Sequence, residues 1–163
     1  MVLKYSGLAA GKGAEVVRGA AELPEALARM EKFANHDYFL IQDLLEGPEM
    51  SLLVLTDSVD HLFLSSAQDY KPLHVGGPNT GGMGGFSPHH LLTPKMWQDI
   101  ETKIIRPTIK AMADNGTPYR GMMYFQLMIT QDGSVVIEIN GRFGDPETQL
   151  IMPLLDCELL PLL

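Results

Sequence analysis

The chain has 163 residues, 45% of them hydrophobic and 20% charged, which is an ordinary globular composition for one domain or two small lobes. Its formal net charge of −8 argues against nucleic-acid and anionic-membrane partners, because an acidic surface gains nothing from displacing their counterions. The single Cys157 excludes an internal disulfide and a cysteine-based metal cage. The sequence shows no leader peptide and no apolar run close to the roughly 18 residues that a membrane-spanning helix needs, so we expect a cytoplasmic protein.

The first quarter of the chain predicts a hairpin, a helix and a returning strand. Residues 1–4 are typical of a strand that enters a glycine-rich turn, and residues 14–17 of the strand that leaves it. Residues 22–35 carry apolar side chains near helical spacing, which predicts an amphipathic helix. Residues 38–41 are expected to return as a strand.

The middle of the chain predicts a second hairpin followed by a long loop. Residues 50–55 and 61–65 are apolar runs separated by Thr56-Asp-Ser, which favours two antiparallel strands. Residues 66–93 are polar and rich in glycine and proline, so we expect a long loop there. Loops of that length inside a compact domain are usually functional or disordered.

The last part of the chain predicts a helix, a hairpin and a final helix. Residues 94–115 read as one long helix whose pattern Pro107 interrupts. Residues 121–130 and 134–140 form a second expected hairpin, and the leucines from 154 to 162 predict a terminal apolar helix. This mixed order favours an α+β fold with a small lobe of about residues 1–42 and a larger lobe of about residues 43–163.

The first candidate site is the glycine-rich loop after the first strand. Gly7, Gly11 and Gly13 allow backbone N–H groups to point into one concavity, which phosphate oxygens commonly occupy, and Lys4 and Lys12 add positive charge. The spacing is not that of a Walker A motif. The alternative is an ordinary hairpin turn with exposed lysines.

The second candidate site is the strand that contains Glu138, Asn140 and Arg142. Alternation along a strand places these three side chains on one face, while Ile137 and Ile139 point to the other. Carboxylate and amide oxygens are hard ligands suited to Mg²⁺, and a guanidinium braces a phosphoryl group through paired N–H donors. The alternative is a half-exposed edge strand with a Glu–Arg pair.

Two further segments carry polar groups in restrained backbone. Residues 142–149 place carboxylates and an amide in a proline-fixed turn beside the expected metal, although such acids also cap helices. Residues 76–85 place Asn79 and Thr80 among glycines, which suits a loop that closes over a substrate. A flexible surface loop is the alternative for this second segment.

Together, and in this order along the chain, these segments resemble the phosphoribosylamine–glycine ligase family. The resemblance runs through residues 3–13, 66–71, 77–88 and 137–149, and it therefore covers nearly the whole chain. The run Arg-Phe-Gly-Asp-Pro-Glu at 142–147 is its most specific part. The resemblance implies an ATP-grasp fold, in which ATP lies between a small nucleotide-clamping lobe and a larger lobe with an antiparallel sheet and helices.

The resemblance also implies a reaction and its cofactors. Glycine would be phosphorylated on its carboxylate by ATP, with Mg²⁺ or alternatively Mn²⁺ bound, and 5-phosphoribosylamine would then attack the glycyl phosphate in de novo purine biosynthesis. The protein would mainly position the reactants and neutralise charge.

The resemblance assigns roles to individual residues. Glu138 and Asn140 would bind the metal, and Arg142 and Asp145 would act on the reacting groups. The remaining implied residues contact nucleotide or acceptor: Lys4, Gly7, Gly11, Lys12 and Gly13 at the phosphates, Gln42 and Leu44 at the adenine, Glu49 at the ribose, and Asp69, Lys71, Asn79 and Thr80 at the acceptor side.

The sequence departs from the family pattern in several places. The family's preceding and following domains are absent, so we expect the rest of a longer chain to supply them. Gln42-Asp43 replaces a pair of glutamates, Phe125-Gln126 replaces Ala-Gly, and Gly141 replaces a cysteine. A catalytically silent nucleotide-binding or scaffolding module is therefore the main alternative, and an ATP-grasp ligase with a different acceptor is a third hypothesis.

Overall fold

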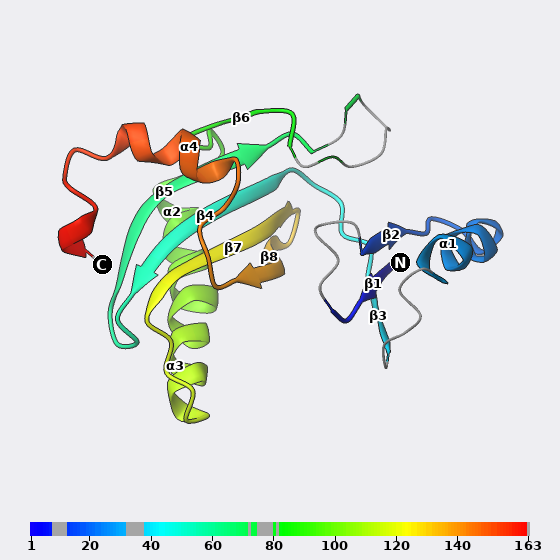
Figure 1. Cartoon of the computed structure of the whole chain (residues 1–163), viewed down its shortest axis with the longest axis horizontal. Helices are drawn as coiled ribbons and strands as arrows, with labels where there is room; N and C mark the ends of the chain where they lie inside the picture. The colour runs from blue at the N-terminus through cyan, green and yellow to red at the C-terminus, as the bar shows by residue number, and fades with distance from the viewer. Residues whose placement is uncertain (8–12, 32–37, 72, 75–79, 81, 163) are drawn as a thin grey trace. The chain divides into compact units, whose positions relative to one another are not determined.

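The computed structural model describes residues 1–7, 13–31, 38–71, 73–74, 80 and 82–162. The chain divides into two compact units, Met1–Leu45 and Glu46–Leu163. Each unit has its own sheet, as Figure 1 shows. None of the helices in the described ranges is long and apolar enough to cross a membrane.

Unit 1 is a three-stranded antiparallel sheet with a helix packed against it. The strand order is β2 (Ala14–Val16), β1 (Val2–Tyr5) and β3 (Phe39–Gln42). The helix α1 (Leu23–Met30) follows a short 3-10 turn, η1 (Ala20–Glu22), and has proline in its first turn, where no backbone donor is lost. Leu3, Val17 and Ala26 are buried between sheet and helix, and this apolar contact stabilises the unit.

Unit 2 contains a five-stranded antiparallel sheet in the order β6, β5, β4, β7, β8. Its strands are β4 (Glu49–Thr56), β5 (His61–Asp69), β6 (Gly85–Phe86), β7 (Gly121–Thr130) and β8 (Gly133–Asn140). The strand β4 is central and buried on both faces, which is why residues 50–55 read as a nearly continuous apolar run. The strand β8 forms one edge of the sheet.

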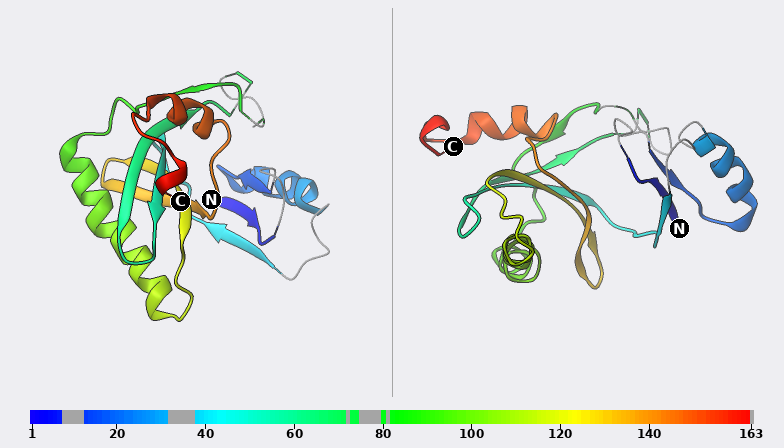
Figure 2. Two further views of the ribbon diagram at one scale, coloured as in Figure 1. Left: turned by 60° about the vertical axis from the view of Figure 1, so that its left-hand side comes forward. Right: turned by 60° about the horizontal axis from the view of Figure 1, so that its bottom comes forward.

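One face of this sheet is covered by a continuous helical run. It consists of α2 (Pro94–Ile100), the π-helical segment η3 (Glu101–Ile105) and α3 (Arg106–Asp114). Figure 2 shows this run lying along one face of the sheet. Alternate residues of β4 and β7 form an apolar cluster with residues of this run. The fully buried members of the cluster include Leu52, Phe125 and Leu127.

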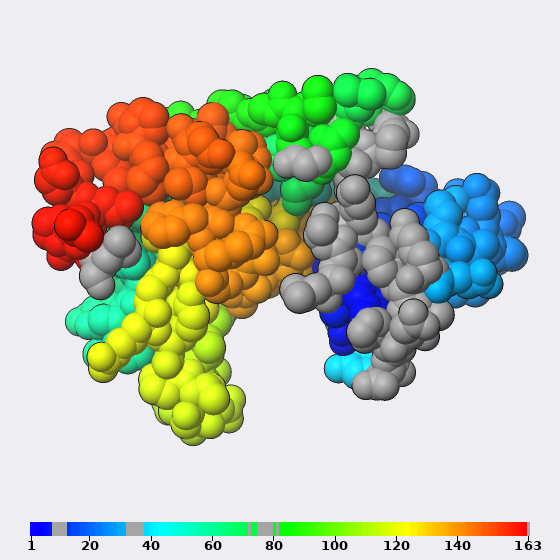
Figure 3. Space-filling model, in the orientation of Figure 1, coloured from blue at the N-terminus to red at the C-terminus, as the bar shows by residue number. Residues whose placement is uncertain are grey.

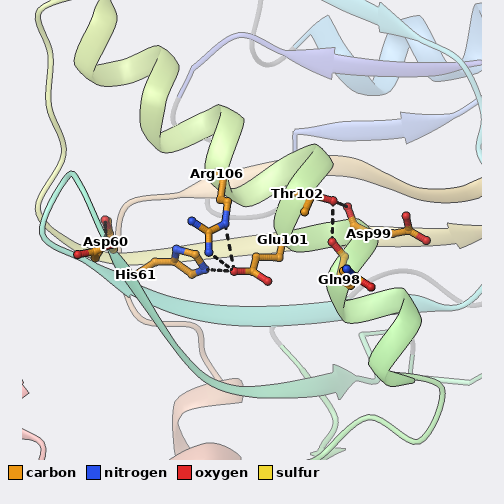
Figure 4. Close-up of polar contacts among 8 residues, drawn as sticks. Asp60, His61, Gln98, Asp99, Glu101, Thr102 and Arg106 are labelled. Carbon is orange, nitrogen blue, oxygen red and sulfur yellow. Dashed lines mark hydrogen bonds and ion pairs between the residues drawn. The ribbon is translucent and has the colours of Figure 1, made fainter.

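A polar contact joins the helical run to the edge of the hairpin β4–β5. Glu101 Oε1 lies 3.2 Å from His61 Nε2 and 2.6 Å from Arg106 Nη2 (Figure 4). The His61 side chain is only 7% exposed, so the carboxylate supplies a partner that water cannot easily provide.

The other face of the sheet carries a smaller apolar cluster under α4 (Glu147–Ile151). Leu53, Met122 and Ile151 are buried there. Two short 3-10 turns, η4 (Met152–Leu154) and η5 (Leu160–Leu162), follow α4. Figure 2 shows α4 and the helical run on opposite faces of the sheet.

Most expected elements are confirmed, including the antiparallel hairpins and the helical run from 94 to 114. Two expectations are wrong. Residues 66–69 belong to β5 and pair with β6, so the loop between them is shorter than expected. The expected terminal helix is not continuous, because Pro153 and Pro161 each lack the N–H group that a helix interior requires.

Candidate functional site

The candidate site lies on the face of the five-stranded sheet opposite the helical run. In an antiparallel ladder, residues directly opposite each other project on the same side. Ser51, Gln126 and Glu138 face one another across β4, β7 and β8, and Leu53, Tyr124 and Asn140 form the next row. Polar side chains from three strands are therefore brought to one surface.

Glu138 and Asn140 lie together at this surface. Asn140 Nδ2 donates a hydrogen bond to Glu138 Oε1 at 3.1 Å, so both side chains are on the same face of β8, as expected. Glu138 is exposed, and the segment that includes β8 and the following turn forms part of the surface in Figure 3. Within the described residues, no three His, Cys, Asp or Glu side chains form a group able to hold a metal ion by themselves.

A β-bulge precedes Glu138. Gln126 is opposite Glu138, whereas the adjacent Leu127 is opposite Val136, which leaves Ile137 as the extra residue on β8. Simple alternation would place Val136 and Glu138 on one face. The bulge instead moves Val136 to the side of Leu127, which faces the helices, and leaves Glu138 on the polar side.

Behind the surface, Glu147 is a buried carboxylate with two hydroxyl donors. It is 1% exposed and accepts hydrogen bonds of 2.9 Å from both Ser51 Oγ and Tyr124 Oη. Burial is the main cause that raises the pKa of Tyr124, and the charge of Glu147 adds to it. The phenol therefore stays protonated and remains a donor, and the start of α4 is tied to the sheet.

Asp69, at the end of β5, is a partly buried carboxylate of the site. Its Oδ1 atom is buried and has no hydrogen-bond partner among the described residues. The pKa of Asp69 is raised to about 6, mainly by burial and next by the charge of Glu147, while Lys71 acts in the opposite direction. Gly82 lies close to Asp69: its φ is +121°, and a Cβ atom there would lie 3.3 Å from that same oxygen.

Glu49, Lys71 and Thr80 form a connected group next to Asp69. Lys71 Nζ lies 3.7 Å from Glu49 Oε2, and Gln126 Nε2 donates to the same oxygen at 2.5 Å. Thr80 Oγ1 donates to the Lys71 carbonyl oxygen at 2.7 Å, which holds Thr80 beside the lysine backbone.

Arg142 and Asp145 lie in the turn after β8 and are both exposed. The guanidinium carbon of Arg142 is 5.9 Å from the centre of the Tyr124 ring, and Nη1 donates to the Phe143 carbonyl oxygen. Asp145 Oδ1 accepts a hydrogen bond of 2.7 Å from Gln149 Nε2. The described residues show no ion pair between Glu138 and Arg142. The Glu–Arg pair that the alternative interpretation of this strand required is therefore not formed.

The nucleotide residues expected in unit 1 belong to its sheet and hairpin. Lys4 is on β1, and Gly7 follows that strand with the Tyr5 ring so close that a Cβ atom would lie 2.6 Å from the Tyr5 hydroxyl. Gly13 accepts a backbone hydrogen bond from Tyr5, and Gln42 ends β3 in an exposed position, two residues before Leu44. Gly11, Lys12 and Asn79 lie outside the described residues.

Comparison with known families identifies the family of this domain. Residues 1–148 match the family described as the phosphoribosylglycinamide synthetase ATP-grasp (A) domain. The chain belongs to the phosphoribosylglycinamide synthetase ATP-grasp domain family. Its α+β architecture with antiparallel sheets is accordingly the ATP-grasp fold, as the sequence resemblance implied.

Individual relatives agree with this family. The chain is 43% identical to a phosphoribosylamine–glycine ligase of Rhizobium meliloti, covering 100% of this chain and 40% of that protein. It is 42% identical to a bifunctional purine biosynthetic protein of Schizosaccharomyces pombe, covering 98% and 21%. A crystal structure of phosphoribosylamine–glycine ligase from Thermotoga maritima superposes with a TM-score of 0.82 at 31% identity, covering 94% and 40%. The chain thus spans about 40% of the length of the ligases it matches.

Within this phosphoribosylglycinamide synthetase domain, Ser51 and Tyr124 were not predicted as part of the site. Both donate to Glu147, which belongs to the turn of residues 142–149 that was expected beside the metal, and the contact between Ser51 and Glu147 spans 96 positions of sequence. The contact between Gln126 and Glu49 spans 77 positions. The only sequence signal for these residues was a polar residue inside an otherwise apolar strand, namely Ser51 in β4 and Gln126 in β7.

Proposed function

We propose that this chain forms the nucleotide- and metal-binding core of an ATP-dependent ligase in de novo purine biosynthesis. The ligase joins glycine to 5-phosphoribosylamine through a glycyl phosphate, with release of ADP and phosphate. The observation that carries the proposal is the adjacent pair Glu138 and Asn140 on the exposed polar face of a phosphoribosylglycinamide synthetase ATP-grasp domain. We place the protein in the cytoplasm, with small-molecule substrates and neither nucleic acid nor membrane as partner.

The metal in this proposal is Mg²⁺, which Mn²⁺ could replace. Glu138 and Asn140 supply hard oxygen atoms from one exposed strand face, which fits Mg²⁺. Two protein ligands suffice, because Mg²⁺ typically keeps waters and substrate phosphate oxygens in its shell. The bound ion would act as a Lewis acid and as a template for the phosphates.

We further propose a small lobe of about residues 1–42 and a larger lobe of about residues 43–163, each of which supplies contacts to the nucleotide. Glu49 would accept hydrogen bonds from the ribose hydroxyls. The other nucleotide contacts are Lys4, Gly7, Gly11, Lys12 and Gly13 at the phosphates, and Gln42 and Leu44 at the adenine.

On the acceptor side, charged groups would orient glycine and the amine. Asp69 has a buried oxygen to which no residue in the described part of the chain donates, and such an oxygen suits an ammonium or amine hydrogen of a bound substrate. Lys71, Asn79 and Thr80 would line the same side. Arg142 would neutralise charge on the transferring phosphoryl group and Asp145 would orient the reacting groups, since both lie in the exposed turn beside the metal pair.

The test is a coupled ADP-release assay with glycine and 5-phosphoribosylamine. The chain should be joined to the further segments present in its longer relatives. We expect ADP release that depends on both substrates, and Glu138→Ala should abolish it. Absence of turnover in a folded, nucleotide-binding protein would reject the ligase proposal.

A nucleotide-binding module without catalysis is the second candidate. It is favoured by Gln126, which places a buried amide beside Glu49 at a position where the family resemblance predicts glycine. Titration calorimetry with ATP and Mg²⁺ separates the two functions. Binding without phosphate release in the joined chain supports the module.

A further inference from the structure

The carboxylate of Glu49 is held on one of its two oxygens. Gln126 Nε2 donates to Oε2 at 2.5 Å, and Lys71 Nζ approaches the same oxygen at 3.7 Å. The described residues donate no hydrogen bond to Oε1, and the Glu49 side chain is 43% exposed. One oxygen is therefore used by the protein and the other is presented to solvent.

The backbone of Glu49 is held as well. Leu91 N–H donates to His89 Nδ1 at 3.1 Å, so the ring proton is on Nε2, which donates to the Glu49 carbonyl oxygen at 3.1 Å. Burial lowers the pKa of His89, which keeps the ring neutral and in this tautomer. The preceding Pro48 carbonyl accepts from Ile129 N–H at 2.9 Å. The position of Glu49 is thus set by contacts from two other segments of unit 2.

Gln126 is suited to orient a carboxylate rather than to bind a ligand through an exposed amide. It is 4% exposed and lies in β7 between Ser51 and Glu138. A buried amide donor paired with a charged acceptor forms a stronger hydrogen bond than a neutral pair, and it restricts rotation of the glutamate side chain. A carboxylate oxygen held in one direction accepts well from a sugar hydroxyl.

We propose that Gln126 is a positioning residue that determines sugar specificity, by holding Glu49 so that Oε1 accepts from a hydroxyl of the nucleotide ribose. The inference rests on the proposed nucleotide site. A nucleotide that lacks the hydroxyl leaves this oriented carboxylate without its donor, and sites built in that way reject deoxy analogues. Gln126 therefore sets the preference for ribonucleotides over deoxyribonucleotides.

The experiment is calorimetry of the chain with ATP and its 2′-deoxy and 3′-deoxy analogues, each with Mg²⁺. Gln126→Met keeps the volume and removes the donor, and Gln131→Met in the exposed β7–β8 turn is the matched control. We expect Gln126→Met to weaken ATP binding about tenfold. For whichever of the two deoxy analogues the unsubstituted chain binds more weakly, the affinity should change less than about twofold. If Gln126→Met does not fold, as judged by circular dichroism, Gln126→Asn serves with the same expectation.

A double-mutant cycle tests whether Gln126 acts through Glu49. Glu49→Ala should abolish the discrimination, and Gln126→Met should then have no further effect on it. The inference would be overturned if Gln126→Met weakened the binding of all three nucleotides equally, or changed only the Mg²⁺ dependence of ATP binding. Either result would leave the proposed nucleotide site intact. Failure of the unsubstituted chain to bind any of the nucleotides would overturn the proposed function and the inference together.

Discussion

The two faces of the five-stranded sheet are built from the same strands, yet they differ in chemistry. The face under the helical run consists of apolar side chains such as Leu52, Val54 and Phe125, each of them fully buried. On the opposite face, Ser51 and Gln126 belong to the same two strands as these residues and are joined by Glu138 from β8. Alternation along a strand thus separates the apolar residues that stabilise the domain from the polar residues of the candidate site.

The two faces also satisfy their polar groups differently. The helix-covered face has almost none to satisfy, so its stability comes from burial. The polar face depends on specific pairs, as between Glu147 and its two hydroxyl donors, and Asp69 Oδ1 has no partner there among the described residues. The comparison predicts that substitutions on the first face lower stability through lost apolar burial, whereas those on the second have smaller effects that depend on specific polar pairs or on pH.

The largest expected effect on stability is that of Phe125→Ala. Phe125 is 0% exposed in the cluster under the helices, so truncation removes buried area and leaves a cavity. We expect the free energy of unfolding to fall by about 3–5 kcal/mol, measured by urea denaturation. Nucleotide affinity of the molecules that remain folded should not change. A smaller loss with altered affinity would mean that the two faces are not separate.

The second effect is that of Glu147→Ala, which removes the acceptor shared by Ser51 and Tyr124. Two buried hydroxyl groups would lose a partner, and we expect the free energy of unfolding to fall by about 1–3 kcal/mol. The control is Glu158→Ala, because Glu158 is exposed. If both variants unfold at the same urea concentration as the unsubstituted chain, the hydrogen bonds of Glu147 contribute nothing to the stability of the domain.

The smallest effect is that of Asp69→Asn, and it depends on pH. The folded-state pKa of about 6 lies above the reference value of 3.8, so ionisation of Asp69 opposes folding as pH rises through that interval. At pH 7.5 we expect Asp69→Asn to melt a few degrees above the unsubstituted chain. Near pH 4 the two melting temperatures should converge. A constant difference across this range would show that the burial of Asp69 is not its cause.

The elements formed by local pattern could be predicted from the sequence. Period-two alternation and short turns specify the hairpins β4–β5 and β7–β8, and helical spacing specifies the run from 94 to 114. The leucines after residue 154 misled the prediction, because apolar spacing outweighed Pro153 and Pro161. Proline removes a donor whatever the surrounding pattern, so it was the better guide.

The candidate site could be predicted only in part. The placement of Glu138 beside Asn140 follows from alternation within one strand, and it is confirmed. The bulge at Ile137 could not be predicted, because it depends on the register with β7. Pairings such as Gln126 with Glu49 are set by the order of strands in the sheet, which no local pattern encodes.

The central claim is that Glu138 and Asn140 bind the metal that accompanies a nucleotide. Calorimetry of ATP binding to the chain, with and without Mg²⁺, tests it most directly in Glu138→Ala and Asn140→Ala. Loss of even a residue that only hydrogen-bonds to a metal ligand costs about 10–100-fold in metal affinity. We therefore expect the Mg²⁺-dependent affinity for ATP to fall at least about tenfold in each variant, while the free energy of unfolding stays the same. Unchanged Mg²⁺-dependent affinity in both variants would contradict the account.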